Sequence, residues 1–584
     1  MVRFLLPACV LVCLVLQPPV AAVAEPLPAA AEWIPQDAVF MVEVPHPDAV
    51  FDLALDPKVV ESVTSVPAYR QQMDSPGYKQ FRAIVAMIEL QLGTDWQTAA
   101  RTLTGGGVTL AAFPNEGAVL IVDAKDPKML ANLHDFALSI AKGEAAKRGT
   151  PEDVAPRDYR GVTGWRFGPD EAHAIIGSRL VVANRPELLR AVVDVQADEN
   201  AKSLADLPAY REACQAVDPK AAARVFVNLT PLKQTPGFKA AFDKDAQPLV
   251  ALLFSTLGEA VENSDWLALA LRVEERALAL SLTMDGKADA GGAATFALPD
   301  APDRGALPNL DVPRRIAGVS LYRDLHAFYA AKDDLFPQRT SGLIFFENMM
   351  GIFFSGLDLT EEVLGETEPE IRLVVAAQQY DPEIGTPQTQ LPAFAAVFRM
   401  TRPDHFAAVA EEAWQKGLGL INFTRGQQAL PGLIIDRHDH GGVRYSMAYF
   451  RAPGKDERTD LPVRYNTRPA LARCGEYLIL SSTDGLTEDL IDALQKEAAG
   501  KVKPSHQTHS LLQLDGRQLA SILAANRNNL VQQNMLKEGN TKPQAEAAID
   551  MLLLLVGSVG SVEVDLGTVA QRPVANLQLQ LNLP

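Results

Sequence analysis

The second half of this chain repeats the order of sequence patterns found in the first half. The glycine-containing turn at 158–162 returns at 439–443, and the strand pattern at 177–183 returns at 475–481. In both copies an amphipathic helical segment follows the strand pattern. Solenoid repeats recur every ~20–50 residues, so units as long as these are whole domains. The pattern therefore predicts an internal duplication of one domain.

Apolar spacing within each copy predicts both strands and helices. Segments 39–44 and 108–113 are short and apolar, whereas 78–92 has apolar residues at helical spacing. Asp126 has the position of an N-cap before a further helix. In the last segment, 577–583, leucines alternate with Gln and Asn, so one face of that strand is apolar and the other polar. These patterns predict an α+β fold with two homologous lobes, each a mainly antiparallel β-sheet packed against amphipathic helices.

The first 24 residues have the pattern of a secretory signal peptide. One positive charge, Arg3, precedes an apolar run at 4–16 and a small-residue end at 22–24. The apolar run is shorter than the roughly 20 residues that span a bilayer, which favours cleavage over an uncleaved anchor. We expect an exported protein, periplasmic or extracellular, with no transmembrane segment after signal cleavage.

After the signal segment, 1–24, the patterns divide the chain into three parts. The first α+β repeat is predicted at 25–285 and the second at 314–584. Between them, 286–313 is rich in Gly, Ala and Pro and is predicted to be a linker. Two cysteines follow the signal segment, Cys214 and Cys474, and the sequence leaves open whether they are bonded.

The chain is acidic, with a formal net charge of -18 at pH 7. No strongly basic segment is present in the sequence. Phosphate backbones attract positive protein surface, so nucleic acid is not an expected partner. An unknown protein or a small apolar ligand is the expected partner instead.

One cluster has residue types suited to metal chemistry. Asp436, His438 and His440 would project from one face of a strand, and two imidazoles with a carboxylate can bind zinc or iron. The matching positions of the first copy hold Ala155, Arg157 and Tyr159, which favours a solvated strand. The glycines after His440 resemble an esterase oxyanion segment, but the required Gly-x-Ser-x-Gly motif is missing from the sequence. We therefore assign no catalytic, cofactor-binding or metal residues and no cofactor.

Two hairpin loops of the second copy are longer than their counterparts in the first. These are 378–392, against 114–117, and 451–470, against 168–171. Conversely, 203–211 of the first copy has no partner in the second. Loops carry binding residues more often than scaffolds do, although loops also tolerate neutral insertions. We expect any specific site to lie at the two enlarged loops.

Four motifs of the first copy carry a resemblance to a known family. They are the opening 33–39, the turn 159–162, the strand 180–183 and the segment 203–210. These motifs resemble a family of exported bacterial proteins catalogued as domain of unknown function 3352. The resemblance covers most of the first copy and, more faintly, the second, which lacks the last motif. It implies an exported bacterial protein and brings no catalytic residues.

The sequence alone leaves three functional hypotheses. The first is a non-catalytic exported binding or structural module that acts between its lobes or through the enlarged loops. The second is a carrier of an apolar ligand or lipid, for which a lobe must enclose an apolar cavity. The third is a metal-assisted hydrolase that uses Asp436, His438 and His440.

Overall fold

A computed structural model of the chain describes residues 29–65, 73, 75–168, 170–198, 200–241, 247–286, 291–299, 301, 303–454, 461–500, 502–504 and 507–582. The predicted signal peptide, 1–24, lies outside these residues. The chain divides into two compact units. Unit 1 extends to Ala240 and includes Ser264–Asp285, and unit 2 takes Ala241–Asn263 and Gly286–Asn582.

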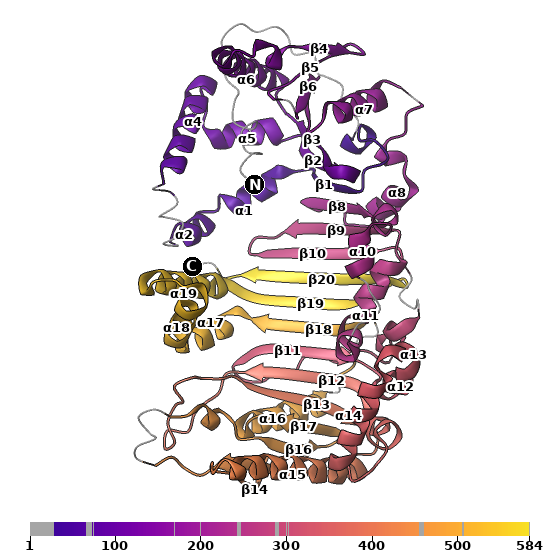
Figure 1. The fold of residues 1–584 in the computed structure, drawn as a ribbon, viewed down its shortest axis with the longest axis vertical. Helices are drawn as coiled ribbons and strands as arrows, with labels where there is room; N and C mark the ends of the chain where they lie inside the picture. The colour runs from indigo at the N-terminus through magenta and orange to yellow at the C-terminus, as the bar shows by residue number, and fades with distance from the viewer. Residues whose placement is uncertain are drawn as a thin grey trace. The chain divides into compact units, whose positions relative to one another are not determined.

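The described strands of unit 1 form one antiparallel sheet (Figure 1). Its strand order is β10-β9-β8-β1-β2-β3-β7-β6-β5-β4. The strands are β1 (Phe40–Val44), β2 (Gly107–Phe113), β3 (Gly117–Asp123), β4 (Arg157–Tyr159), β5 (Val162–Trp165), β6 (Ala172–Ile176), β7 (Arg179–Ala183), β8 (Ala223–Asn228), β9 (Trp266–Val273) and β10 (Ala277–Met284).

The described strands of unit 2 pair in the corresponding order, β20-β19-β18-β11-β12-β13-β17-β16-β15-β14. All of these pairs are antiparallel as well. The strands are β11 (Arg315–Tyr322), β12 (Thr367–Ala376), β13 (Ala393–Met400), β14 (Leu433–His440), β15 (Val443–Phe450), β16 (Ala470–Cys474), β17 (Tyr477–Ser481), β18 (Thr508–Asp515), β19 (Val559–Val569) and β20 (Arg572–Leu581).

Strand register relates the two units residue by residue. Val119 pairs with Ala183 in unit 1, and Ala395 pairs with Ser481 in unit 2. The sequence alignment sets these same positions opposite one another. An equal strand order and register is what a duplication of one domain would produce, while the duplication itself stays a prediction.

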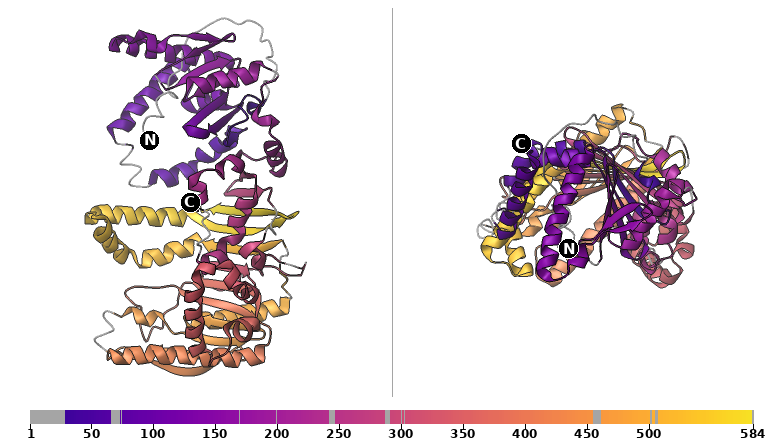
Figure 2. Two further views of the ribbon diagram at one scale, coloured as in Figure 1. Left: turned by 45° about the vertical axis from the view of Figure 1, so that its right-hand side comes forward. Right: turned by 90° about the horizontal axis from the view of Figure 1, so that it is seen from above.

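Helices fill the connections between the strands. In unit 1 they are α1 (Pro47–Ala54), α2 (Pro57–Ser65), α4 (Pro76–Leu92), α5 (Trp96–Thr104), α6 (Pro127–Arg148), α7 (Pro186–Ala197), α8 (Pro208–Ala216), α9 (Leu229–Leu232) and α10 (Pro236–Ala241). In unit 2 they are α11 (Pro248–Asn263), α12 (Leu325–Ala330), α13 (Lys332–Leu335), α14 (Thr340–Phe353), α15 (Pro403–Gln427), α16 (Asp484–Gly500), α17 (Gly516–Ala525), α18 (Arg527–Glu538) and α19 (Lys542–Ser558). Helices α17–α19 pack against one another beside β18–β20 (Figure 2).

Local sequence signals place several of these elements correctly. The Asp126 carboxylate accepts hydrogen bonds from the N–H groups of Lys128 and Met129, at 2.8 and 3.1 Å, and so caps α6 as predicted. Asn184 lies just before α7. Its side chain bonds the Ala118 N–H and the Glu116 carbonyl, which fixes the turn between β2 and β3.

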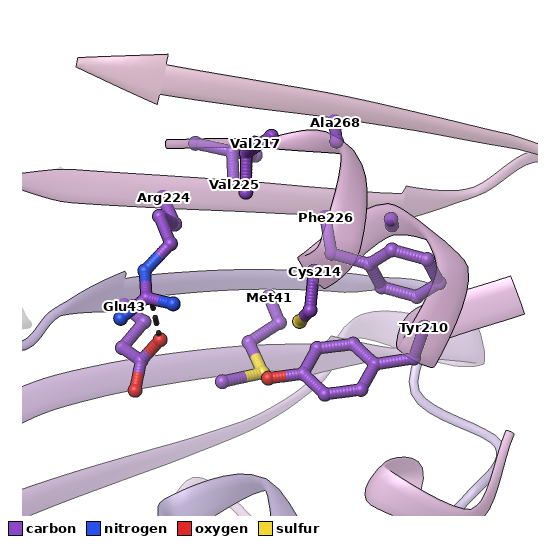
Figure 3. A pocket seen from close by; sticks show the side chains of 10 residues that line it. Met41, Glu43, Tyr210, Cys214, Val217, Arg224, Val225, Phe226 and Ala268 are labelled. Carbon is purple, nitrogen blue, oxygen red and sulfur yellow. Dashed lines mark ion pairs between the residues drawn. The ribbon is translucent and has the colours of Figure 1, made fainter. Parts of the chain in front are cut away.

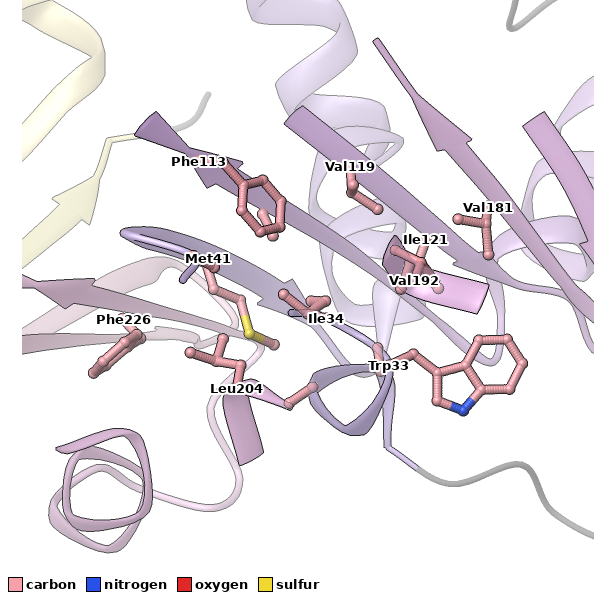
Figure 4. Packing of buried hydrophobic residues seen from close by; sticks show 14 of the residues in the cluster. Trp33, Ile34, Met41, Phe113, Val119, Ile121, Val181, Val192, Leu204 and Phe226 are labelled. Carbon is pink, nitrogen blue, oxygen red and sulfur yellow. The ribbon is translucent and has the colours of Figure 1, made fainter. Parts of the chain in front are cut away.

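The core of unit 1 gathers three of the four motifs that carry the family resemblance, those at 33–39, 180–183 and 203–210 (Figure 4). Ile34 and Leu204 are both fully buried, and the Leu204 N–H donates to the Ile34 carbonyl at 2.7 Å. The Arg179 guanidinium stacks on the Trp33 ring, with its carbon 4.3 Å from the ring centroid, and pairs with Asp123 at 2.6 Å. These motifs therefore build a core, and that role alone accounts for their residue types.

The central strands of unit 2 are covered by helices on both faces. Val397 and Ile479 belong to a core cluster with Leu490 of α16. Leu478 belongs to a second cluster on the opposite face, with Phe406 of α15 and residues of α12–α14. Alternate residues of a strand point to opposite faces, so these strands supply two cores. The closing strand β20 differs, because its leucines are half-buried while Gln578 and Gln580 are exposed, as their alternation predicted.

The described part of the predicted linker is packed into unit 2. The 3₁₀ segment η6 (Gly292–Ala297) lies against α11. Glu259 of that helix accepts a hydrogen bond from the Ala294 N–H at 3.2 Å. Leu310 is fully buried further along. Among the described residues, no helix combines the length and apolar content that crossing a membrane requires.

His509 makes the stability of unit 2 sensitive to acid. Its side chain is 4% exposed, and burial together with the neighbouring Arg323 charge lowers its pKa to about 3. Between pH ~6.5 and ~3 this imidazole is protonated in the unfolded chain but neutral in the folded chain. The free energy of unfolding therefore falls as the pH falls through this window. We expect the urea midpoint to drop less from pH 7 to 4.5 in His509→Gln than in the unaltered protein. The exposed-site variant His46→Gln should keep the full drop, and an equal drop in all three proteins would contradict this account.

Candidate functional site

The buried side-chain amide of Asn466 links the two enlarged loops of unit 2. This side chain is 1% exposed and uses its full hydrogen-bonding capacity. Its oxygen accepts from the Tyr380 hydroxyl and the Leu391 N–H, at 2.7 and 2.8 Å. Its nitrogen donates to the carbonyls of Thr389 and Val463, at 2.8 and 2.9 Å. The described part of the loop at 451–470 is thus locked onto the loop at 378–392.

A cavity of about 300 Å³ lies where these loops meet the start of α16. Its two arginines are already paired, Arg314 with Asp489 at 3.2 Å and Arg468 with Asp484 at 2.7 Å. Burial raises the pKa of both carboxyls despite these arginines, and it raises the pKa of Tyr380 to about 12. The predicted location therefore holds a polar cavity in which both arginines are paired, and Asp381 and Glu488 add two further acids to the lining.

Asp436, His438 and His440 lie on the exposed strand β14 and do not converge on a common point. His438 is 3.6 Å from Asp436. His440 instead turns toward α16, where it lies 2.9 Å from Asp492. Within the described ranges, no three His, Cys, Asp or Glu side chains are arranged to hold a metal ion.

The two cysteines that follow the signal segment are unbonded thiols. Cys474 is buried at the end of β16, and Cys214 is half-buried on α8. Burial raises the pKa of both thiols. A thiolate is the reactive form of cysteine, so neither residue has the environment of a nucleophile.

An apolar cavity of about 270 Å³ lies in unit 2 between the sheet and α15. The sheet forms one wall and the helical connections form the other. From the sheet come Thr367, Phe398, Leu471, Leu478 and Leu480, and from the helices and their ends come Leu325, Phe354, Val363, Leu364, Phe406, Ala410, Ala413 and Trp414.

The lining of this apolar cavity offers almost no polar contact. The Thr367 hydroxyl donates to the Leu364 carbonyl at 2.8 Å and is thereby satisfied. The indole N–H of Trp414 is the other side-chain polar group of the lining residues. Leu480 is 43% exposed, so part of the wall is accessible from solvent. Sequence reasoning missed these residues because each has the spacing of an ordinary core position.

Unit 1 contains a much smaller cavity beside α8 (Figure 3). Met41, Tyr210 and Cys214 point into it, and Glu43 pairs with Arg224 at 3.6 Å at its side. Its volume is about 20 Å³, which is near the ~10–15 Å³ that one water molecule needs. This cavity is therefore too small for an organic ligand.

The fold belongs to the α+β class. Comparison with known proteins shows that the first part of the chain matches one family model. Residues 2–280 match the family model described as "Protein of unknown function (DUF3352)". This match agrees with the family resemblance that the motifs of the first copy carry. No curated protein matches the chain.

Solved structures with detectable similarity include three crystal forms of TP0453. Forms IV, I and III are 10%, 12% and 12% identical to this chain, with TM-scores of 0.23, 0.23 and 0.22. Each match covers 44% of this chain and 79%, 79% and 78% of the respective TP0453 chain. Similarity this low does not establish a shared fold.

Proposed function

We propose that this protein is an exported, non-catalytic binding protein whose unit 2 holds a small apolar ligand between its sheet and α15. The observation that carries this proposal is the apolar cavity lined by Phe406, Trp414 and Leu478. Catalysis needs polar groups that converge on a reacting bond. The lining supplies apolar contact instead, which suits binding.

The size of the apolar cavity fits such a ligand. Its volume, about 270 Å³, is close to the lower end of the ~300–1,000 Å³ typical of ligand sites. An engineered apolar cavity of about 150 Å³ stays dry and binds benzene. A short acyl chain or an aromatic group would therefore gain more from this cavity than water would.

Export is the second part of the proposal and rests on the sequence. The pattern of Arg3, an apolar run and a small-residue end supports a signal peptide. An envelope or extracellular setting would bring the protein into contact with lipids and their fragments, which are ligands of the required chemistry.

A cavity-filling variant tests the proposed site. Ala413 lines the cavity on α15, whereas Ala408 of the same helix is exposed. Toluene should bind the unaltered protein and change the fluorescence of Trp414. Ala413→Phe should weaken that binding by at least about tenfold, because the added ring occupies the space of the ligand.

Ala408→Phe is the matched control, since it adds the same ring to the same helix outside the cavity. It should change toluene affinity by less than about twofold. Thermal unfolding of each variant establishes that it is folded. Equal weakening by both substitutions, or a lack of toluene binding to the unaltered protein, would contradict the proposed function.

A further inference from the structure

Unit 1 carries a second ligand-sized cavity, of about 240 Å³, between the β4–β5 hairpin and α7. Its apolar floor includes Leu189 and Val193, which are 7% and 2% exposed. Trp165 and Tyr159 add aromatic rings to its wall. The cavity therefore combines an apolar base with an aromatic side.

The charge of this lining is opposite to that of the whole protein. Arg157, Arg166 and Arg190 line the cavity against one acid, Asp158, in a chain with a net charge of -18. Arg157 has no ion-pair partner within the described part of the chain. Arg190 pairs with Glu187 at 3.1 Å, but both side chains are more than half exposed, and exposed pairs of this kind are weak.

Strand register shows what unit 2 places at the equivalent position. Gly164 pairs with Arg157 and Ala174, and Tyr445 pairs with His438 and Ala472. Gly164 is therefore the counterpart of Tyr445. The buried Tyr445 ring occupies this space in unit 2, where its hydroxyl donates to Glu488 at 2.7 Å.

The helices that follow these strands, α7 in unit 1 and α16 in unit 2, also differ at one equivalent position. Glu488 is the fifth residue of α16, and Arg190 is the fifth residue of α7. Unit 2 thus has a tyrosine and an acid where unit 1 has a glycine and an arginine. The glycine of unit 1 leaves open the space that the tyrosine ring fills in unit 2, and the arginine replaces the negative charge of the glutamate with a positive one.

Backbone geometry does not require the glycine. A Cβ built on Gly164 would lie 3.5 Å from Cδ2 of Leu189 and 3.6 Å from the Arg157 carbonyl oxygen, which are ordinary contacts. The structure could therefore accommodate a side chain at position 164, and that side chain would lie next to two residues that line the cavity, Leu189 and Arg157. The absence of a side chain at this position keeps the cavity open.

We infer that this cavity binds a small organic anion, in which a carboxylate or phosphate group is attached to an apolar body. Arginine forms charge-assisted, often bidentate hydrogen bonds with such acid groups. The apolar floor and Trp165 would hold the remainder of the ligand. The proposal concerns unit 1 and is independent of the apolar ligand proposed for unit 2.

Matched probes test both halves of this recognition. 4-Phenylbutyrate should bind and perturb Trp165 fluorescence. Its neutral isostere, 4-phenylbutanamide, should bind at least about tenfold more weakly because it lacks the charge that arginine recognises. Inorganic phosphate alone should also bind more weakly, since it cannot use the apolar floor.

Three variants assign the binding to this cavity. Gly164→Tyr, which copies the residue of unit 2, should abolish binding of 4-phenylbutyrate. Arg157→Gln should weaken binding by about three- to tenfold. Because Arg157 is exposed, this variant should fold like the unaltered protein, which circular dichroism checks. Arg148→Gln removes the same charge from an exposed position of α6 and should leave affinity within about twofold. The inference would be overturned if the unaltered protein did not bind 4-phenylbutyrate, or if it bound the amide with equal affinity. It would also be overturned if Gly164→Tyr bound 4-phenylbutyrate fully, or if the two glutamine variants had equal effects.

Discussion

Replacing Arg323 with methionine is expected to destabilise unit 2 by about 3–5 kcal/mol, the cost typical of disrupting a buried charged network. Arg323 is fully buried. Its guanidinium donates to the carbonyls of Leu252 and Leu253 in α11, at 2.7 and 3.2 Å. It also donates to the Tyr322 and His509 carbonyls and to the Ser510 hydroxyl, at 2.7, 3.2 and 2.9 Å.

This network explains the size of the expected effect. Methionine would fill much of the volume but leave several buried acceptors without a donor, and each such group costs about 1–3 kcal/mol. Removing the buried charge recovers part of this loss, because burial already lowers the pKa of Arg323 to about 10. The remaining loss should loosen the contact of α11 with β11 and β18.

Hydrogen–deuterium exchange measures the Arg323 effect within unit 2. Amides of β11 and β18 should exchange faster in Arg323→Met, while those of β2 and β3 in unit 1 should keep their rates. Arg323→Lys should lie between the two proteins because one ammonium keeps the charge but has fewer donors. The exposed variant Arg444→Met should stay within about 0.5 kcal/mol of the unaltered protein. Unchanged exchange in Arg323→Met would refute this role.

Replacing Asn466 with alanine is expected to cost about 2–3 kcal/mol, and the loss should be local to the enlarged loops. The four partners of the Asn466 amide include the Leu391 N–H and the Thr389 carbonyl, which alanine would leave without this partner. The loop at 378–392 has a second anchor, since Asn526, which directly follows α17, bonds both the N–H and the carbonyl of Gln390, at 2.9 and 2.7 Å. Asn466→Ala should therefore loosen the contact between the two loops, which keep the bonds from Gln378 to the backbone carbonyl of residue 466 and from Gln388 to the Leu461 carbonyl, at 2.9 and 3.3 Å. The loop at 378–392 should stay attached to the end of α17.

Local exchange distinguishes this outcome from general destabilisation. Peptides from 378–392 and 461–468 should lose protection in Asn466→Ala, whereas those from α16 should change little. Asn528→Ala, at an exposed position of α18, provides the control and should leave both loops protected. Loss of protection throughout unit 2 would show that Asn466 supports more than the loops.

Local sequence patterns predicted the features that depend on neighbouring residues. The Asp126 cap follows from a side chain that reaches N–H groups two and three residues away. The alternation of leucine and glutamine in β20 follows from strand geometry. The correspondence of Val119 with Ala395 depends on matching order, and strand pairing reproduces it.

The cavities could not be predicted because they depend on space that packed elements leave unfilled. Phe406 and Trp414 come from α15 and Leu478 from β17, and each resembles a residue of a solid core. Asn466 resembles a solvated loop residue, although it is buried. The sequence alignment already sets Gly164 opposite Tyr445, but only the structure shows that a cavity lies beside Gly164.

The central claim, that unit 2 holds an apolar ligand, is tested most directly by what the protein carries when it is purified from its native source. Protein purified from the native source would be extracted with organic solvent, and the extract analysed by mass spectrometry. The account predicts an apolar compound at about one per chain in the unaltered protein and in Ala408→Phe, and its loss in folded Ala413→Phe. An extract without such a compound, or the same amount in all three proteins, would contradict the account.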